Sequence, residues 1–306
     1  MKVSRVVQGA LWAYAAADRI VDSLALEYPF ISHDYENDNY IYGGSAVLAK
    51  SYARLTADQP DQRGFLYARE LIPAENFEIE VEFKIEGAGN SLYGDGMAVW
   101  LLSPDQEVAE GSVFGLKDYF MGTAILIDTY RNHRPGKAFP YVVLMQNDGR
   151  QGYDNDNDGK ANELAGYSVR GLHNPASNTK MKIRYQGGEL SVEINHKGRF
   201  DKAFSLPYNL DGAKRLAFSA STGQLSERHD IYSVRVTELD YQAPNKPAQS
   251  PQYAGNFAGQ TRKSSPWTGL LVKLSLGVAG CVGALKMYKL YIRKKKYRAY
   301  EPFEFS

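Results

Sequence analysis

Residues 77–85 alternate strictly between apolar and charged side chains, and this period of two restricts the segment to an extended strand. The odd positions from Phe77 to Ile85 are apolar, and the even positions between them are Glu78, Glu80, Glu82 and Lys84. In a strand, successive side chains point to opposite faces, so the apolar set lines one face and the charged set lines the other. The segment therefore predicts a sheet that buries one face and exposes the other.

The rest of the stretch between residues 26 and 240 is also typical of strands. Continuously apolar runs, the pattern of strands covered on both faces, occur at Met97–Leu102, Thr123–Ile127 and Tyr141–Met145. Two alternating runs flank Gly187-Gly188, which predicts a hairpin. No sustained helical period occurs in this stretch. The sequence predicts an all-β domain over residues 25–242, with two antiparallel sheets packed as a jelly-roll sandwich.

The N-terminal segment and the region after the domain carry different signals. Residues 1–17 start with basic side chains and continue as a short apolar run with several alanines, which resembles a cleavable signal peptide. Because Gln8 and Asp18 weaken the apolar run, a surface helix is the alternative interpretation. Residues 243–266 are rich in Pro, Gln, Asn, Gly and Ser, which predicts a flexible stalk.

Residues 267–290 predict a membrane anchor. Their apolar run, interrupted by Lys273, is just long enough as a helix to cross the hydrocarbon core of a bilayer. An amphipathic surface helix is the alternative. Basic residues crowd the chain from Lys286 onward, so the positive-inside rule makes residues 291–306 a cytoplasmic tail and places the large domain in a lumen.

Composition narrows the classes of partner. Lys and Arg number 36 and Asp and Glu number 35, so the net charge of +1 gives no sign of a nucleic-acid-binding surface. The single cysteine, Cys281, lies in the apolar C-terminal segment, which excludes a disulfide within the large domain. The 22 tyrosines suit strands and the stacking of carbohydrate rings.

Acidic and amide side chains concentrate at residues 153–159, Tyr-Asp-Asn-Asp-Asn-Asp-Gly. Closely spaced oxygens of this kind are the ligands that Ca²⁺ prefers. An EF-hand loop is excluded, because Ala165 stands where its twelfth-position glutamate is required. Residues 128–132, Asp-Thr-Tyr-Arg-Asn, follow a predicted strand and would complete a cation site. On its own, each segment is more typical of a solvated turn.

Three further segments carry positions suited to sugar binding. Asp95 lies between two glycines at the start of a predicted strand, where its carboxylate can accept sugar hydroxyls and the backbone permits close approach. Ser45 follows a glycine pair, and residues 223–225, Gly-Gln-Leu, lie in a polar loop. Without further context, an ordinary turn explains each of them.

Taken in chain order, these segments resemble the legume-lectin-like (L-type) cargo receptors of the early secretory pathway. The resemblance covers about residues 40–240 and rests on the ordered set 44–48, 94–100, 113–115, 128–132, 139–141, 153–159 and 222–230. It implies a concanavalin-like lectin fold without enzymatic activity, calcium as cofactor, and high-mannose glycoproteins as partners. It also implies a single-pass type I receptor in ER, intermediate-compartment or Golgi membranes, with Phe303 and Phe305 as an export signal for coat proteins.

The resemblance also implies which residues form the site. The calcium ligands would be the side chains of Asp128, Asn132 and Asp158 and the carbonyl oxygen of Tyr130. The mannose contacts would be Ser45, Asp95, Asn132, Asn155 and the backbone of Gly223, Gln224 and Leu225.

Three departures from the family pattern bear on function. Asn155 stands where relatives carry a titratable histidine, and Gln224 stands where they carry Asp or Gly. Tyr167 and Ala203 occupy the two positions of their disulfide. Because carboxylates and amides remain, we expect mannose binding to fall little between pH 7.4 and about 6. His133, next to Asn132, is expected to face solvent.

Two other functions compete with a lectin. A glycoside hydrolase needs paired carboxylates in a cleft, whereas the row of Glu78, Glu80 and Glu82 is better explained as a solvated strand face. A structural or adaptor membrane protein with a decayed lectin site is the stronger alternative, because Asn155 and Gln224 alter two sugar contacts.

Overall fold

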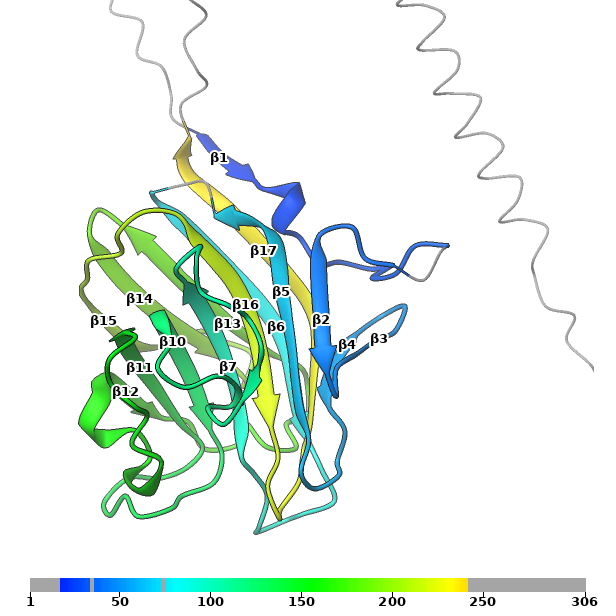
Figure 1. Ribbon diagram of the computed structural model, residues 1–306, viewed down its shortest axis with the longest axis vertical. Coiled ribbons are helices and arrows are strands. Elements are labelled where there is room, and N and C mark those ends of the chain that lie inside the picture. The colour runs from blue at the N-terminus through cyan, green and yellow to red at the C-terminus, as the bar shows by residue number, and fades with distance from the viewer. Residues whose placement is uncertain (1–16, 34–35, 73–74, 242–306) are drawn as a thin grey trace, which may run out of the picture. The chain divides into compact units, whose positions relative to one another are not determined.

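The structure is a computed structural model that describes residues 17–33, 36–72 and 75–241 (Figure 1). The predicted stalk, membrane helix and cytoplasmic tail lie outside the described residues, as do residues 1–16 of the predicted signal peptide. Within the described ranges, no helix is long and apolar enough to cross a membrane.

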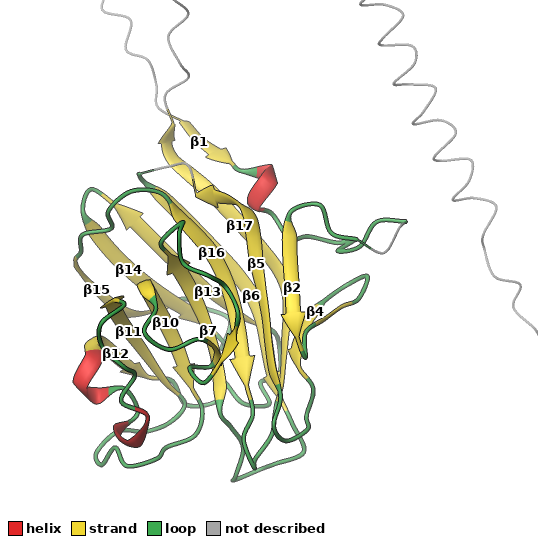
Figure 2. Ribbon diagram, in the orientation of Figure 1, coloured by secondary structure: helices red, strands yellow, loops and turns green. Residues whose placement is uncertain are grey.

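Two antiparallel sheets pack face to face, as the strands in Figure 2 show. The eight-stranded sheet has the order β15 (Asp201–Pro207), β14 (Glu189–Asn195), β13 (Thr179–Gln186), β6 (Phe77–Glu86), β17 (Arg228–Tyr241), β4 (Ala53–Thr56), β3 (Val47–Leu48), with β1 (Ala17–Ile20) also on β17. The seven-stranded sheet has the order β12 (Glu163–Ser168), β11 (Tyr141–Asp148), β10 (Met121–Asp128), β7 (Gly96–Leu102), β16 (Lys214–Ser221), β5 (Arg63–Ile72), β2 (Tyr40–Gly44). The all-β sandwich predicted from the sequence is confirmed.

Shorter elements complete the described chain. A small hairpin of β8 (Glu110–Gly111) and β9 (Gly115–Leu116) belongs to the long β7–β10 connection. The 3₁₀ turns are η1 (Asp22–Leu24), η2 (Asn155–Asn157) and η3 (Lys160–Asn162). Because β1 pairs with β17 and η1 buries Leu24, residues 17–24 also belong to the sandwich, upstream of the boundary placed at residue 25.

The alternating segment forms β6, in the middle of the eight-stranded sheet. Its five apolar side chains are at most 1% exposed and face the core between the sheets. Its glutamates pair with basic side chains of β13 across the outer surface: Glu80 lies 3.4 Å from Lys182, and Glu78 lies 3.5 Å from Arg184. The row of glutamates is therefore an ion-paired outer face of the sheet, as the sequence predicts.

Strand β7 is buried along its whole length because both of its faces are covered. Met97, Val99 and Leu101 point into the core between the sheets. On the opposite face, the Trp100 ring meets Phe120 edge-on at 4.9 Å, and its Nε1 donates to Ser219 Oγ at 2.8 Å. This second apolar cluster explains why the run is continuously apolar rather than alternating.

Candidate functional site

Five strands of the seven-stranded sheet start or end along one edge, meaning the edge formed by the strand ends. Their register brings the candidate site together. Gly96, the first residue of β7, pairs with Asp128 on one side and with Ser221 on the other. Ser221 in turn pairs with Arg63 of β5, which β2 flanks. The segments around residues 45, 95, 128 and 222 are far apart in the sequence, yet they leave the sheet at the same edge.

A pocket of about 140 Å³ opens at this edge. The residues that line it are Asp95, Ser112, Phe114, Asp128, Tyr130, Asn132, Tyr153, Asn155 and Ser221. Five of them carry roles predicted from the sequence, and Asp158 contacts the pocket through Asn132. The fold thus brings predicted calcium ligands and predicted sugar contacts into one cavity.

Two buried aspartates form the cation half of the pocket. Asp128 is 4% exposed and Asp158 is 0% exposed. The Tyr130 N–H donates to Asp128 Oδ1 at 3.1 Å, and the Asn132 N–H donates to Asp158 Oδ1 at 2.8 Å. Asn132 Nδ2 also donates to the carbonyl oxygen of Asn155 at 2.9 Å, which ties the two acidic segments together.

Negative charge accumulates between these segments. Burial, and then the charge of Asp158, raises the pKa of Asp128 well above its usual range. Burial also raises the pKa of Asp158, although hydrogen bonds from residues 132 and 133 oppose the shift. The nearby Arg134 guanidinium is paired with Glu163. The two aspartates therefore form an acidic pair beside an arginine that is already engaged.

The donor set fits a hard cation. Asp158 Oδ2 is buried and has no hydrogen-bond partner, and a cation bound by oxygens would satisfy it. Among the described residues there is no group of three or more His, Cys, Asp or Glu side chains placed to hold a metal. The set here is instead two carboxylates, the Asn132 amide and a backbone carbonyl, and such oxygen ligands suit Ca²⁺ better than softer metals.

Asp95 forms the sugar half of the pocket. Its N–H donates to the Ser221 carbonyl at 3.1 Å, and its own carbonyl accepts from the Thr129 N–H at 3.0 Å. Its carboxylate accepts a long hydrogen bond of 3.5 Å from Ser221 Oγ. Gly223 lies against this carboxylate, because a β-carbon at position 223 would be 3.2 Å from Oδ1. Glycine at 223 therefore keeps the approach to Asp95 open.

Four predicted sugar contacts, Ser45 and residues 223–225, are not among the residues that line the pocket. Ser45 Oγ accepts the Arg63 N–H at 3.3 Å, on the strand beside Ser221. Gln224 is exposed and Leu225 is partly buried in the loop that follows β16. Their roles in sugar binding stay predictions.

Asn155 lines the pocket as the first residue of η2. His133, expected to face solvent alone, is exposed, but its Nδ1 lies 3.2 Å from the carbonyl oxygen of Asp156. That expectation is wrong in part, because the turn after Asn132 carries His133 across the acidic loop.

Four pocket residues were not assigned a role from the sequence: Ser112, Phe114, Tyr153 and Ser221. Phe114 reaches the pocket from the β7–β10 connection, and its ring meets Tyr153 edge-on at 5.9 Å. These two rings form an apolar wall that can pack against the C–H face of a sugar. The signal that could have identified Phe114 and Tyr153 was the resemblance, because both lie in segments that contributed to it. No signal in the sequence pointed to Ser112.

Comparison with known proteins decides the family. The legume-like lectin family matches the chain over residues 17–245. The chain belongs to this family. Its members bind carbohydrate, so the prediction of a lectin rather than an enzyme is confirmed for this legume-like lectin.

Relatives of this legume-like lectin occur in fungi and animals. An L-type lectin-like domain-containing protein of Schizosaccharomyces pombe is 38% identical, and the match covers 90% of each chain. The vesicular integral-membrane protein VIP36 of Mus musculus is 31% identical, and the match covers 84% of this chain and 78% of VIP36.

Solved structures of the VIP36 exoplasmic/lumenal domain have the same fold. The Ca²⁺/Man-bound form is 30% identical with a TM-score of 0.69, and the match covers 74% of this chain and 94% of that domain. The Ca²⁺/Man3GlcNAc-bound form is also 30% identical, with a TM-score of 0.67 over 75% of this chain and 93% of that domain.

Proposed function

We propose that this lectin binds mannose in a calcium-dependent manner. We further propose that it is a single-pass type I receptor that carries high-mannose glycoproteins between the ER and the Golgi. The observation that carries the proposal is a pocket lined by Asp95 and the buried Asp128, with the buried Asp158 bonded to Asn132 of its lining. The VIP36 lumenal domain, whose solved forms hold Ca²⁺ and mannose, supports the same ligands here.

In this proposal the two halves of the pocket have separate roles. Asp128, Asn132, Asp158 and the Tyr130 carbonyl hold Ca²⁺, which supplies positive charge between the acidic segments. Asp95 accepts hydrogen bonds from sugar hydroxyls, and the second hydrogen of Asn132 Nδ2 is left to donate to one. Ser45, Asn155 and residues 223–225 extend these contacts. Ordering the loops before the sugar arrives lowers the entropy lost on binding.

An adaptor protein with a decayed sugar site is the second candidate. The observation that favours it is the pair of substitutions at Asn155, which lines the pocket, and Gln224, which is exposed beside it. Under this alternative the membrane anchor and tail are kept, but glycans do not bind.

A glycan array separates these candidates. We expect the purified full-length protein to bind high-mannose glycans in calcium and to lose this binding when a chelator removes the ion, because the two buried aspartates then repel each other. Complex and sulfated glycans on the same array are the matched control. Absence of binding to every glycan in calcium would favour the adaptor, and binding that survives the chelator would contradict the calcium site.

The membrane anchor has its own test. We expect alkaline carbonate to leave the full-length chain in the membrane pellet, whereas truncation before Trp267 should release a soluble domain, because residues 267–290 carry the apolar run. Release of the full-length chain by carbonate would refute a spanning helix.

The proposed export signal is tested separately. Changing Phe303 and Phe305 to Ala should retain a reporter chimera in the ER, because the proposed coat-binding signal would then be missing.

A further inference from the structure

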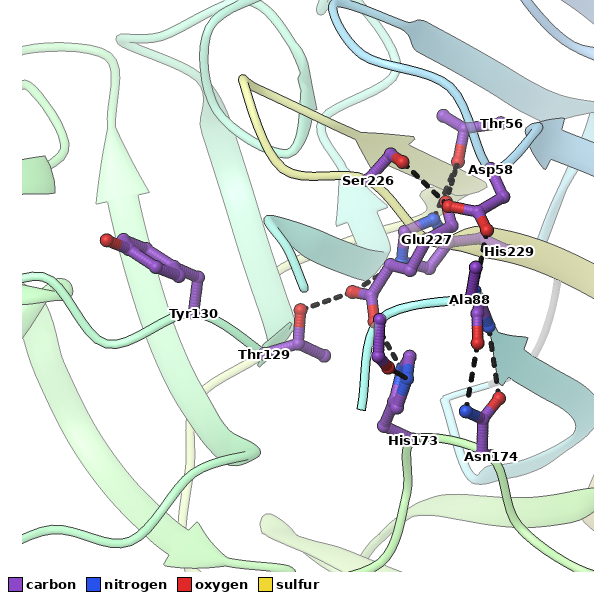
Figure 3. Close-up of polar contacts among 12 residues, drawn as sticks. Thr56, Asp58, Ala88, Thr129, Tyr130, His173, Asn174, Ser226, Glu227 and His229 are labelled. Atoms are coloured by element: carbon purple, nitrogen blue, oxygen red, sulfur yellow. Dashed lines mark hydrogen bonds and ion pairs between the residues drawn. The ribbon is translucent and has the colours of Figure 1, made fainter. Parts of the chain in front are cut away.

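A cluster of buried polar residues around Glu227 connects the loops that form the pocket (Figure 3). Glu227 is 0% exposed and follows the loop at residues 222–226. Thr129 Oγ1 donates to its Oε1, His229 Nε2 lies 3.2 Å from the same oxygen, and His173 Nδ1 lies 2.9 Å from Oε2. Because Thr129 stands between Asp128 and Tyr130, Glu227 links the calcium segment to the sugar loop.

The second ring nitrogen and the ring face of His173 contact the loop that leads to Asp95. His173 Nε2 lies 2.7 Å from the carbonyl oxygen of Gly89, and its ring stacks on Tyr93 with centroids 3.6 Å apart and planes 2° apart. The neighbouring Asn174 exchanges two hydrogen bonds of 3.0 Å with the backbone of Gly87. One histidine therefore joins the loop before Asp95 to the carboxylate behind the calcium segment.

The contacts of His173 require both of its ring nitrogens to donate. Nδ1 faces an ionised carboxylate and Nε2 faces a backbone carbonyl, and neither partner has a hydrogen to give. A neutral imidazole has one N–H, so it would set a lone pair against one of these acceptors. Both hydrogen bonds of the His173 ring can therefore form only when His173 is protonated.

His229 differs in this respect. Its Nδ1 lies 2.7 Å from the Thr56 hydroxyl, which can either donate or accept, and its Nε2 faces Glu227. A neutral His229 that donates from Nε2 can accept at Nδ1 from the Thr56 hydroxyl, although that hydroxyl then gives up its 3.2 Å bond to the Glu227 carbonyl. A neutral imidazole can therefore keep both ring contacts of His229, whereas it cannot keep both ring contacts of His173.

The charges around His173 favour its protonated form. Glu227 faces it from the start of β17, Asp58 contributes negative charge from the loop after β4, and Tyr93 covers its ring. Burial alone lowers the pKa of His173, but the hydrogen bonds to Glu227 and Gly89 and these charges outweigh it, so the pKa is raised. Burial likewise opposes ionisation of Glu227, yet its hydrogen bonds from the two histidines and Thr129 bring its pKa to about 2.

We propose that His173 and Glu227 are positioning residues of the sugar pocket, and that protonated His173 holds the Asp95 loop and the calcium segment in the binding geometry. The inference rests on the proposed mannose-binding function. A histidine with a raised pKa in the folded state stabilises that state below its unfolded pKa, and this contribution is lost as pH rises through the folded pKa. Loop order is therefore greatest below the unfolded pKa of histidine and falls as pH rises through the raised pKa of His173.

This behaviour is compatible with the expectation drawn from Asn155. A pocket without a titratable group in its lining does not release sugar on mild acidification, and the protonated His173 strengthens the scaffold over the same interval. The affinity falls in the alkaline direction, because the competent fraction of the loops decreases when His173 loses its second N–H.

The test is calorimetric titration of the full-length protein with mannobiose at saturating, fixed free calcium and at pH 6, 7 and 8. For the wild type we expect affinity to fall about fivefold from pH 6 to pH 8, the size of one typical lost hydrogen bond. His173→Gln, which is never charged, should bind weakly with no pH dependence. His173→Arg, which is always charged and can donate to both acceptors, should bind at the acidic wild-type level throughout.

Two control histidines and the ligand-free fold sharpen the result. His196 bonds the Arg170 carbonyl away from the pocket, and His133 lies against the acidic loop. The variants His196→Gln and His133→Ala should therefore keep the pH dependence of the wild type. Thermal melts of each variant report whether it is folded. A flat wild-type profile, or a fall that persists in folded His173→Gln, overturns the inference alone. A wild type that binds mannobiose at no pH refutes the proposed function, and the positioning role with it.

Discussion

Replacing Asp128 with Asn is expected to lower the affinity for calcium by roughly 100-fold or more, because Ca²⁺ affinity depends steeply on the number of charged ligands. Mannose binding should be lost with it. The substitution conserves shape, and the Asn oxygen can still accept the Tyr130 N–H that bonds Asp128 Oδ1. The loss would therefore report the missing charge and not a rearranged loop.

The same substitution should stabilise the calcium-free protein. An aspartate whose folded pKa is raised above its unfolded value destabilises the fold at neutral pH, and Asp128 is such a group because it is buried beside Asp158. Removal of one buried charge is expected to raise the Tm without calcium by about 2–4 °C, which corresponds to ~1 kcal/mol in a domain of this size. Calcium, which stabilises the wild type by binding the folded state, should no longer shift the Tm.

Calcium calorimetry and thermal melts with and without chelator measure both effects. Asp156→Asn is the matched control, because Asp156 is exposed in the same loop and is not a proposed ligand. It should keep the calcium affinity and the calcium-dependent Tm of the wild type. Tight calcium binding by Asp128→Asn would rule out the proposed ligand set.

Replacing Asp95 with Asn is expected to reduce mannose affinity by roughly 100-fold while calcium affinity stays near that of the wild type. Hydrogen bonds to a charged acceptor contribute about 1.5–3 kcal/mol each, and the Asp95 carboxylate is placed to accept from sugar hydroxyls. Its backbone bonds to Ser221 and Thr129 do not depend on the side chain, so the loop should keep its course. This outcome would separate the sugar half of the pocket from the cation half.

Asp61→Asn provides the control for Asp95→Asn. Asp61 is exposed, and its N–H donates to the Gly223 carbonyl at 2.9 Å, so it lies beside the same loop. Its side chain has no proposed sugar contact, and both affinities should remain unchanged. Equal loss of mannose binding in both variants would mean that net charge near the loop, and not the Asp95 carboxylate, governs affinity.

The sequence predicted the strands best where burial imposes a period. Alternation identified β6, and continuous apolar runs identified β7, β10 and β11. It did not show why β7 is apolar on both faces, because the second cluster around Trp100 forms with the long connection that follows the strand. It also missed β1, whose exposed residues carry no apolar pattern and are held by pairing with β17.

The pocket could be predicted in part because its residues follow strand ends. Asp95, Asp128 and residues 222–225 flank apolar runs, and the paired register of β7, β10 and β16 then brings them together. The Glu227 cluster could not be predicted in this way. His173 lies in a loop without periodicity, and the 2.9 Å contact to Glu227 depends on a packing of loops that the pattern does not specify.

The central claim is that a calcium site in this pocket prepares the sugar site. Calorimetric titration of mannobiose into the full-length protein, once in saturating calcium and once after chelation, tests it most directly. The account predicts measurable mannobiose binding in calcium, and loss of that binding after chelation that is reversed when calcium is restored. Equal mannobiose affinity in the two conditions would contradict it.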